Sequence, residues 1–284
     1  MTLQQVVMLT LQASVLLIVF GFGLQASGRD LFYLVRRPSL LARSLVAMFV
    51  VMPILAVVLV RVLELRQSLE IALVALAISP VPPLLPKKQD KAGGEAAYAL
   101  GLMAVVSLLA IAVVPLSLWV LGHYSARPLQ MPPAAIAKIV VMMTLAPLVT
   151  GVIVRTIAPA VAVRLEKPTK LIAMVLLGAG LGALLIAALP VIAGLIDFRT
   201  ILTMAVFVGV GLAVGHVLGG PHADEATVLA LSTASRHPAI ALATAKVNFP
   251  NEPYLGATIL LYLLVLTAIS VPYVLHQRQR LVPS

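Results

Sequence analysis

The sequence predicts an all-α polytopic membrane protein with about nine transmembrane helices, arranged as inverted repeats with two broken crossing helices. The chain is 61% hydrophobic and 11% charged over 284 residues, and its mean hydropathy is +1.10. Apolar runs of about 20 residues, the length that crosses a bilayer, recur along it. Two of these runs, one in each half, are interrupted by proline, which a regular helix does not accommodate.

The spans are expected near 5–25, 41–60, 69–92, 95–121, 135–155, 170–190, 198–218, 226–246 and 254–275. The third and the eighth are the interrupted ones. The first segment has no Lys or Arg before Arg29, so it lacks the basic region of a cleaved signal peptide and is expected to be a retained span. Residues 1–284 are therefore expected to form a single transmembrane domain with no soluble domain appended.

The distribution of Lys and Arg predicts the orientation. With the N-terminus outside, most basic residues fall in cytoplasmic segments, among them Arg36, Arg37, Lys87 and Lys88. This is the bias expected of a cell (inner) membrane protein whose C-terminus is cytoplasmic. The same bias accounts for the net charge of +10, so no nucleic-acid partner is expected, and membrane lipid surrounds the protein. The chain has no cysteine, which excludes disulfides and thiolate metal sites.

The eighth span carries polar residues at its centre, where Arg236, His237 and Pro238 follow one another behind Ser232, Thr233 and Ser235. A charge at bilayer depth is unfavourable by about 2.5–3.5 kcal/mol on insertion scales, so it normally faces a cavity or a partner. Pro238 cannot donate a backbone hydrogen bond and weakens the helix there. A charge and a helix break at one place predict a binding site. The alternative is a helix end in the cytosol.

The third span contains the second break. Ser79 is followed by prolines at 80, 82, 83 and 86, which exclude a continuous helix. Pro86 is well placed to begin a new half-helix. The alternative is a plain cytosolic loop, because Lys87 and Lys88 follow directly.

One proline-interrupted span in each half, running in opposite directions, is typical of an inverted-repeat transporter with its site at the bilayer midplane. Half-helix N-termini and Arg236 together favour an anionic ligand, since arginine can bind a carboxylate or sulfonate through two hydrogen bonds. The predicted partner is therefore a small organic anion. The candidate substrate-binding residues are Arg236, His237, Ser235, Thr233, Ser232, Ser79, Pro80, Pro82 and Pro83.

Several motifs resemble those of the bile acid:sodium symporter family, within the wider group that includes auxin-efflux-type carriers. They are the glycine-rich end of the first span at 19–24 before Arg29-Asp30, Met52-Pro53, Ile78-Ser79-Pro80, Gly93-Gly94-Glu95 and the stretch 232–241. The resemblance implies a panel formed by the spans near 5–25, 135–155 and 170–190. It also implies a core formed by the spans within 41–121 and 198–275, with a substrate crevice between the two.

The chain departs from the family's sodium motif. The resemblance places the sodium-binding Ser-Asn on Leu85 and Pro86, and hydroxyl residues of the next span near Met103 and Ala104. It places the Glu and Gln of the second crossing motif on Ser232 and Arg236. Apolar side chains offer sodium no oxygen ligand, so we expect that sodium coupling is lost and that Arg236 acts as a tethered cation.

Other functions remain open at this stage. His237 can be a proton-coupling group or a neutral hydrogen-bonding residue. Sodium or proton coupling of a bile-acid-like substrate, an anion channel and a non-transporting membrane sensor are the alternatives to a sodium-independent carrier. The sequence has no paired carboxylates in one span, no metal-ligand cluster and no nucleophile with a base, so no catalytic, cofactor or metal site is expected and the protein is not expected to be an enzyme.

Overall fold

The computed structural model describes residues 2–124 and 129–281, and this part of the chain is all-helical. The elements are α1 Leu3–Gln25, α2 Gly28–Leu31, α3 Pro38–Val46, η1 Ala47–Val51, α4 Met52–Val62, α5 Gln67–Ile78, α6 Leu85–Lys91, α7 Ala96–Tyr124, α8 Pro133–Val140, η2 Val141–Leu145, α9 Ala146–Ile157, α10 Pro159–Leu195, α11 Phe198–Gly219, α12 Ala223–Ala234, α13 Pro238–Asn248 and α14 Leu255–Leu281. The two segments labelled η are π-helical.

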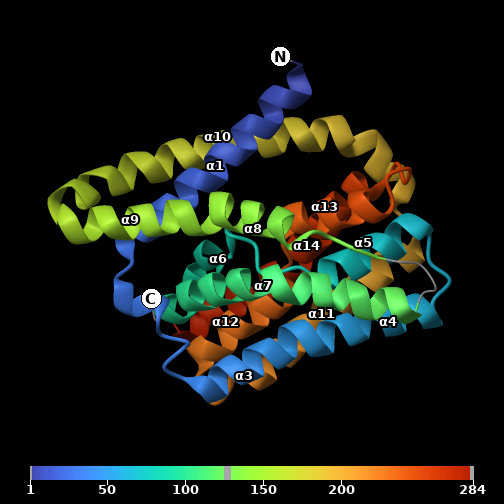
Figure 1. Cartoon of the computed structure of the whole chain (residues 1–284), viewed down its shortest axis with the longest axis horizontal. Helices are drawn as coiled ribbons and strands as arrows, with labels where there is room; N and C mark the ends of the chain where they lie inside the picture. Colours follow the sequence, from blue (N-terminus) through green and yellow to red (C-terminus); the bar gives the residue numbers. More distant parts are fainter. Residues whose placement is uncertain (1, 125–128, 282–284) are drawn as a thin grey trace.

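Within the described residues, seven helical stretches are long and apolar enough to cross a membrane. They are α1, α3 to α4, α7, α8 to α9, α10, α11 and α14. Two pairs of shorter helices, α5 with α6 and α12 with α13, correspond to the predicted interrupted spans (Figure 1). The predicted fold class is confirmed, since the chain is a polytopic α-helical membrane protein.

Both π-helical segments have the same local cause. The segment η1 precedes Pro53 and η2 precedes Pro147, and each proline lies in the first turn of the helix that follows. A proline has no N–H to donate and its ring crowds the carbonyl four residues back, so the preceding turn widens rather than breaks. The second and fifth spans therefore continue through their prolines.

The sixth span is longer than predicted. A helix was expected near 170–190, after a connection that begins at about residue 156, but α10 runs without interruption for 37 residues and contains Pro168 and Pro190. At 1.5 Å per residue such a helix is about 55 Å long, well beyond the roughly 30 Å of a hydrocarbon core. Its first turns, with Arg164 and Lys167 exposed, thus extend past the bilayer.

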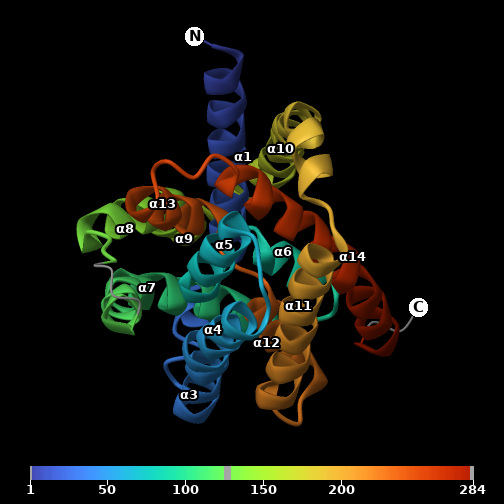
Figure 2. The ribbon, with the colours of Figure 1, turned by 90° about the vertical axis from the view of Figure 1, so that its right-hand side faces the viewer.

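Three groups of helices pack closely against one another. The helix α1 lies along α9 and α10, and α11 lies along α12, while α5 packs against α13 and α14. Figure 2 shows α1 and α10 on one side of the molecule and α3, α4 and α11 on the other. We call the two ends of the bundle the Arg66 end, where α4 meets α5 and α10 meets α11, and the Arg37 end, where α2 leads to α3 and α11 to α12.

Glycines allow the closest approaches. Gly211, Gly215 and Gly219 form one stripe on α11, and a Cβ on Gly215 would lie 2.5 Å from a carbonyl oxygen of α12. On α1, a Cβ on Gly23 would lie 2.3 Å from a carbonyl oxygen of α9. Small residues let helices in a membrane gain packing contacts that a larger side chain would prevent. The position of α12, and with it the second break, therefore depends on the α11 stripe.

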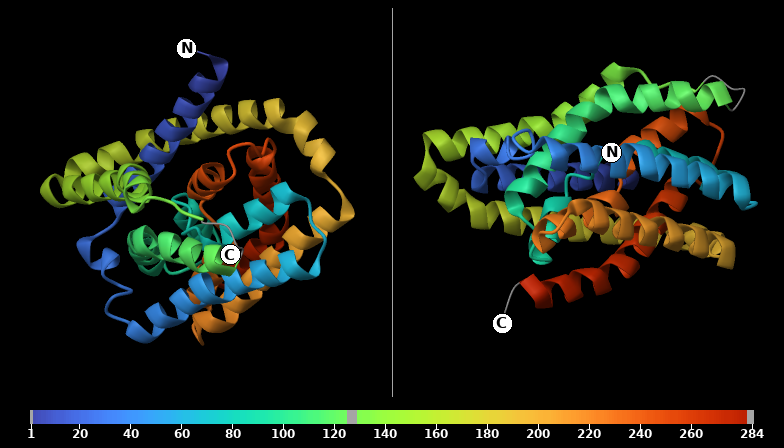
Figure 3. Two further views of the ribbon diagram at one scale, coloured as in Figure 1. Left: turned by 45° about the vertical axis from the view of Figure 1, so that its right-hand side comes forward. Right: turned by 90° about the horizontal axis from the view of Figure 1, so that it is seen from below.

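The largest cluster of buried apolar side chains joins α4, α5, α7, α11, α12 and α14. In the left view of Figure 3 the C-terminal helices, coloured red, lie among the earlier ones, and the right view shows the last turns of the C-terminal helix at the edge of the molecule. Both broken helices lie in this cluster, so their breaks are buried in protein and away from lipid. Backbone that is not helical is tolerated at membrane depth only under that condition.

Candidate functional site

The first break lies between α5 and α6. The helix α5 ends at Ile78, and Ser79 to Leu84 are non-helical, because three of these six residues are prolines. The helix α6 begins at Leu85 with Pro86 in its first turn, as the sequence predicts. Ser79 is fully buried, and its hydroxyl donates to the carbonyl of Leu76 at 2.8 Å.

The second break lies between α12 and α13. The helix α12 ends at Ala234, and Ser235 to His237 are non-helical, with Ser235 and His237 extended, before α13 begins at Pro238. His237 is the N-cap, and its Nδ1 accepts from the backbone N–H of Ile240 at 3.4 Å. An Nδ1 that accepts a hydrogen bond carries no proton, so this geometry describes a neutral imidazole with its proton on Nε2.

The two breaks are in contact, and we call the place where they meet the crossing. The backbone N–H of His237 donates to the carbonyl of Pro80 at 2.8 Å and to the hydroxyl of Ser79 at 3.1 Å. The Arg236 guanidinium donates through Nη1 to the carbonyl of Ser79 at 3.3 Å. Four of the predicted site residues are thus brought together directly, from segments more than 150 positions apart in the chain. Backbone groups that lose their helical partner at one break are thus hydrogen-bonded by the other break.

Arg236 is the largest side chain in the described chain that is fully buried, with 0% of its surface exposed. None of the ion pairs among residues 2–124 and 129–281 involves it, and its Nε and Nη2 have no hydrogen-bond partner. Buried charges are usually paired because an uncompensated one is strongly unfavourable. Arg236 is therefore a permanent cation with donor groups to spare.

Helix ends explain how the fold tolerates this cation. Both α5 and α12 end at the crossing, and a helix C-terminus carries a partial charge of about −0.5. The two together offset the charge of Arg236, while the N-terminus of α13 adds a partial positive charge. The hydroxyl of Tyr262 on α14 satisfies the carbonyl of Ala234 at 2.5 Å. The crossing thus has no excess of negative charge even without a bound cation.

The two hydroxyl residues near the end of α12, Ser232 and Thr233, have different hydrogen-bond partners. Ser232 accepts from Nε2 of Gln89 on α6 at 2.7 Å, and the same amide donates to the carbonyl of Val228 at 2.8 Å. The Oε1 of Gln89 is buried without a partner. Thr233 donates to the carbonyl of Leu229 at 2.8 Å, within its own helix. Ser232 therefore joins α12 to α6, whereas Thr233 does not face the first break.

The remaining predicted residues make no side-chain hydrogen bond across the crossing in the described chain. Ser235 and Pro83 are buried and Pro82 is half-buried. Gln89 and Tyr262 contact the broken segments but were missed from the sequence. Gln89 lies in the polar run that follows Pro86, which looks like a cytosolic loop, and Tyr262 is an isolated tyrosine in an apolar helix, so neither carried a signal.

Lys88, on α6, is a partly buried cation. Its Nζ donates to the hydroxyl of Ser270 on α14. Lys88 therefore turns toward α14 and makes no hydrogen bond to the residues of the crossing. Among the described residues no group of three His, Asp or Glu could hold a metal ion.

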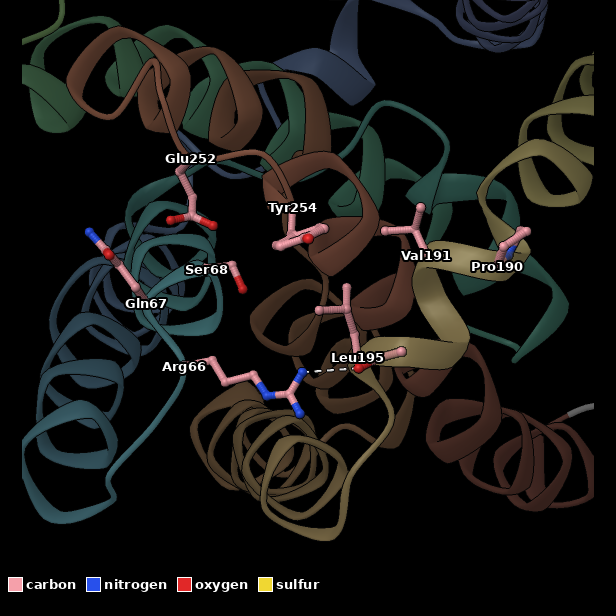
Figure 4. A pocket seen from close by; sticks show the side chains of 9 residues that line it. Arg66, Gln67, Ser68, Pro190, Val191, Leu195, Glu252 and Tyr254 are labelled. Atoms are coloured by element: carbon pink, nitrogen blue, oxygen red, sulfur yellow. Dashed lines mark hydrogen bonds between the residues drawn. The ribbon is translucent and has the colours of Figure 1, made fainter.

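A cavity of about 560 Å³ lies at the Arg66 end, between the start of α5, the end of α10 and the connection from α13 to α14. Figure 4 shows Arg66, Ser68, Glu252 and Tyr254 around it. Arg66 donates to the carbonyl of Gly194 at 3.0 Å. None of the predicted site residues lines this cavity, so it is separate from the crossing.

Comparison with known proteins gives one family. The model of the Sodium Bile acid symporter family matches residues 13–195, which is more than half of the chain. The matched region runs from α1 through the first break to the end of α10, and it ends before the second break. No curated protein matches the chain.

Proposed function

Because the chain belongs to the sodium bile acid symporter family, we propose that this membrane transporter carries a small organic anion by alternating access, without sodium. The family implies a membrane transporter, and the multi-pass fold agrees with that. The proposal of a sodium-independent anion carrier rests on Arg236. This buried cation lies at the crossing of two broken helices, and two of its nitrogens have no hydrogen-bond partner.

The burial of Arg236 favours one of its two possible roles. A direct contact with substrate needs an exposed guanidinium, whereas this one is enclosed in the present conformation. A tethered cation acts from inside the protein, because its field reaches an anion beside the crossing through a medium of low dielectric constant. We therefore assign to Arg236 the charge that a bound sodium supplies elsewhere, and the substrate anion binds next to it.

The side chains at the expected sodium positions support this assignment. Leu85, Met103 and Ala104 are buried apolar residues, and Pro86 is buried in the first turn of α6. Hard cations bind through several oxygen ligands, and none of these four side chains has one. The cation that balances the substrate's charge is then part of the chain and does not cross the membrane with it.

Gln89 favours the second candidate, a sodium-coupled symporter. Its Oε1 is a buried oxygen without a partner, close to Ser232. These two side chains and backbone carbonyls would be the ligands. Proton coupling through His237 has weaker support, because protonating Nδ1 would break the cap at the start of α13.

Counterflow in proteoliposomes tests the proposal. Vesicles loaded with an unlabelled organic anion should accumulate the labelled anion equally well in sodium and in choline buffer. A channel or a sensor would show no counterflow. Uptake that disappears in choline would show sodium coupling, and Gln89→Leu should then abolish it as well.

The motion and the orientation complete the proposal. We assign the motion to the group formed by α1, α8, α9 and α10, which slides against the remaining helices, and the cavity at the Arg66 end lies between the two.

The N-terminus is outside and the C-terminus cytoplasmic. Because the chain has no cysteine, single cysteines at Thr2 and Ser284 can be labelled with an impermeant reagent, and labelling from the same side would contradict this orientation.

A further inference from the structure

A second cavity, of about 840 Å³, opens on the side of the molecule and has no place in the function proposed above. We call it the lateral groove. Its walls are one face of η1 and α4 and one face of α7, and α5 and α13 supply most of the remaining lining. The helix α5 packs against both α4 and α13 (Figure 2), so it forms the floor. The volume lies within the range of about 300–1,000 Å³ typical of ligand sites.

The lining shows that the lateral groove opens toward lipid. Most of its residues are aliphatic or aromatic. Its rim consists of exposed side chains of η1, α4 and α7, namely Val50, Ile54, Val58, Leu116, Val120 and Tyr124. Exposed apolar side chains on a membrane-spanning helix face acyl chains. An occupant that enters from the side is therefore an apolar chain from the surrounding leaflet.

The lateral groove contains one residue of each charge. Arg61 lies in the last turn of α4 and Glu70 in the first turn of α5, so both belong to the Arg66 end. Neither side chain forms an ion pair or a hydrogen bond with the part of the chain that the structure describes. A cation and an anion at one end of an apolar groove match a ligand with an apolar tail and a zwitterionic head.

A buried hydroxyl gives an independent indication of a ligand. Thr244 on α13 lines the lateral groove and is 2% exposed, and its Oγ1 has no hydrogen-bond partner. Buried polar groups are nearly always satisfied, by protein, water or ligand. The hydroxyl can donate to an ester carbonyl of a lipid whose tail fills the groove.

We propose that the lateral groove binds an acyl chain of one phospholipid with a phosphate and a primary ammonium group, as in phosphatidylethanolamine. The phosphate accepts from the Arg61 guanidinium, which suits its geometry, and the ammonium group donates to Glu70. A headgroup with a net negative charge would satisfy Arg61 and be repelled by Glu70. A quaternary ammonium has no proton to donate to the carboxylate.

The position of the groove gives this lipid a role. One residue of its lining is Ile78, the last of α5, and Ser79 follows it directly. Ser79 accepts from Arg236 and from His237. A chain in the groove thus packs against the helix whose end forms half of the crossing, and the lipid stabilises the position of α5 in this conformation.

Native mass spectrometry of the purified protein tests the proposal. With phosphatidylethanolamine, phosphatidylcholine and phosphatidylglycerol at equal concentrations, the protein should retain one phosphatidylethanolamine about tenfold more strongly than either other lipid, the factor that corresponds to one charge-assisted hydrogen bond. Retention without preference among the three lipids, or a second copy of the chain in place of a lipid, would overturn it.

Variants localise the lipid. Val57→Trp fills the lateral groove from α4 and should remove the bound lipid, while Val175→Trp, on the exposed face of α10, should leave it in place. The double change Arg61→Gln with Glu70→Gln should abolish the preference for phosphatidylethanolamine without filling the groove. Its matched control is Arg199→Gln with Glu64→Gln, an exposed pair at the same end, which should keep the preference.

The test has two kinds of variant, so that one can still decide the outcome if the other misfolds. If Val57→Trp does not give a folded protein, the charge variant decides the outcome. Full retention of one phosphatidylethanolamine by both folded variants would show that the lipid binds elsewhere and would contradict the proposal. These measurements need no transport substrate, so they stand even if the proposed transport function fails.

Discussion

Two arginines of this protein meet opposite conditions. Arg37, at the Arg37 end, forms an ion pair with Glu225 and lies 4.4 Å over the ring of Tyr33, with about half of its side chain exposed. Arg236, at the crossing, is fully buried and has one hydrogen bond, to a backbone carbonyl. The first cation is neutralised by the fold, and the second keeps donors that the fold does not use.

The comparison separates a structural charge from a functional one. Glu225 lies in the first turn of α12, and it accepts from the hydroxyl of Tyr33 at 2.8 Å as well as from Arg37. This cluster ties the segment between α1 and α3 to the beginning of the second broken helix. Removing a charge there should affect stability, whereas removing Arg236 should affect transport. Three predictions test this contrast, and a fourth tests a weaker charge effect at the Arg66 end; they run from the largest effect to the smallest.

Arg236→Ala should produce the largest loss. Truncating a buried charge that faces an anion removes about 2–5 kcal/mol of interaction, so counterflow should fall by about 30-fold or more. Arg236→Lys keeps the charge and should retain part of the activity if Arg236 acts as a tethered cation, and little if a bidentate contact is needed. Rates should be measured on variants that elute as folded protein. Unchanged transport by Arg236→Ala would show that the charge is not part of the mechanism.

Glu225→Gln should destabilise the protein without abolishing transport. It leaves Arg37 without its counter-charge and weakens the bond from Tyr33, a loss of about 2 kcal/mol, or about 4–8 °C in the unfolding midpoint. Thermal unfolding in detergent measures the effect. Glu64→Gln is the control, since that carboxylate is 95% exposed and should change the midpoint little. Equal midpoints for both variants would show that the cluster contributes no stability.

Tyr33→Phe should have a smaller effect at the same cluster. It removes the hydrogen bond to Glu225 but keeps the ring beneath Arg37, so about 1 kcal/mol is lost. Burial and the nearby Glu225 raise the pKa of the Tyr33 hydroxyl above its usual value, so the hydroxyl remains a donor at neutral and moderately alkaline pH. The double variant with Glu225→Gln should then be less destabilised than the sum of the two single changes.

Asp197→Asn should have the smallest effect, and it should depend on pH. Asp197 caps α11, and the hydrogen bond from the backbone of Thr200 is the main cause that lowers the pKa of its carboxyl group. A carboxylate with a lowered pKa stabilises the fold above the unfolded value of about 3.9, and this is lost as pH falls through the folded pKa. The difference in unfolding midpoint from wild type should therefore be present at pH 6 and shrink below pH 4. A difference independent of pH would assign the effect to packing.

The sequence by itself determined where the chain spans the membrane and where two spans break. Apolar runs of bilayer length predict the spans. The run of prolines that starts at Pro80, and Pro238, predict the breaks, because proline lacks an N–H wherever it occurs. These are local properties. The one clear error, the connection expected before α10, came from treating the basic residues around Lys167 as a loop, although such residues also suit a helix that extends beyond the bilayer.

Only the tertiary structure decided what the breaks contact. The packing of α5, α6 and α12 brings the carbonyl of Ser79 to Arg236 and the amide of Gln89 to Ser232. The same packing leaves Arg236 without a carboxylate partner in the described chain. Glu225 pairs with Arg37 across 188 positions for the same reason. A charged side chain is neutralised or left available according to neighbours that are distant in the sequence, because electrostatic interactions depend on separation in space and on burial.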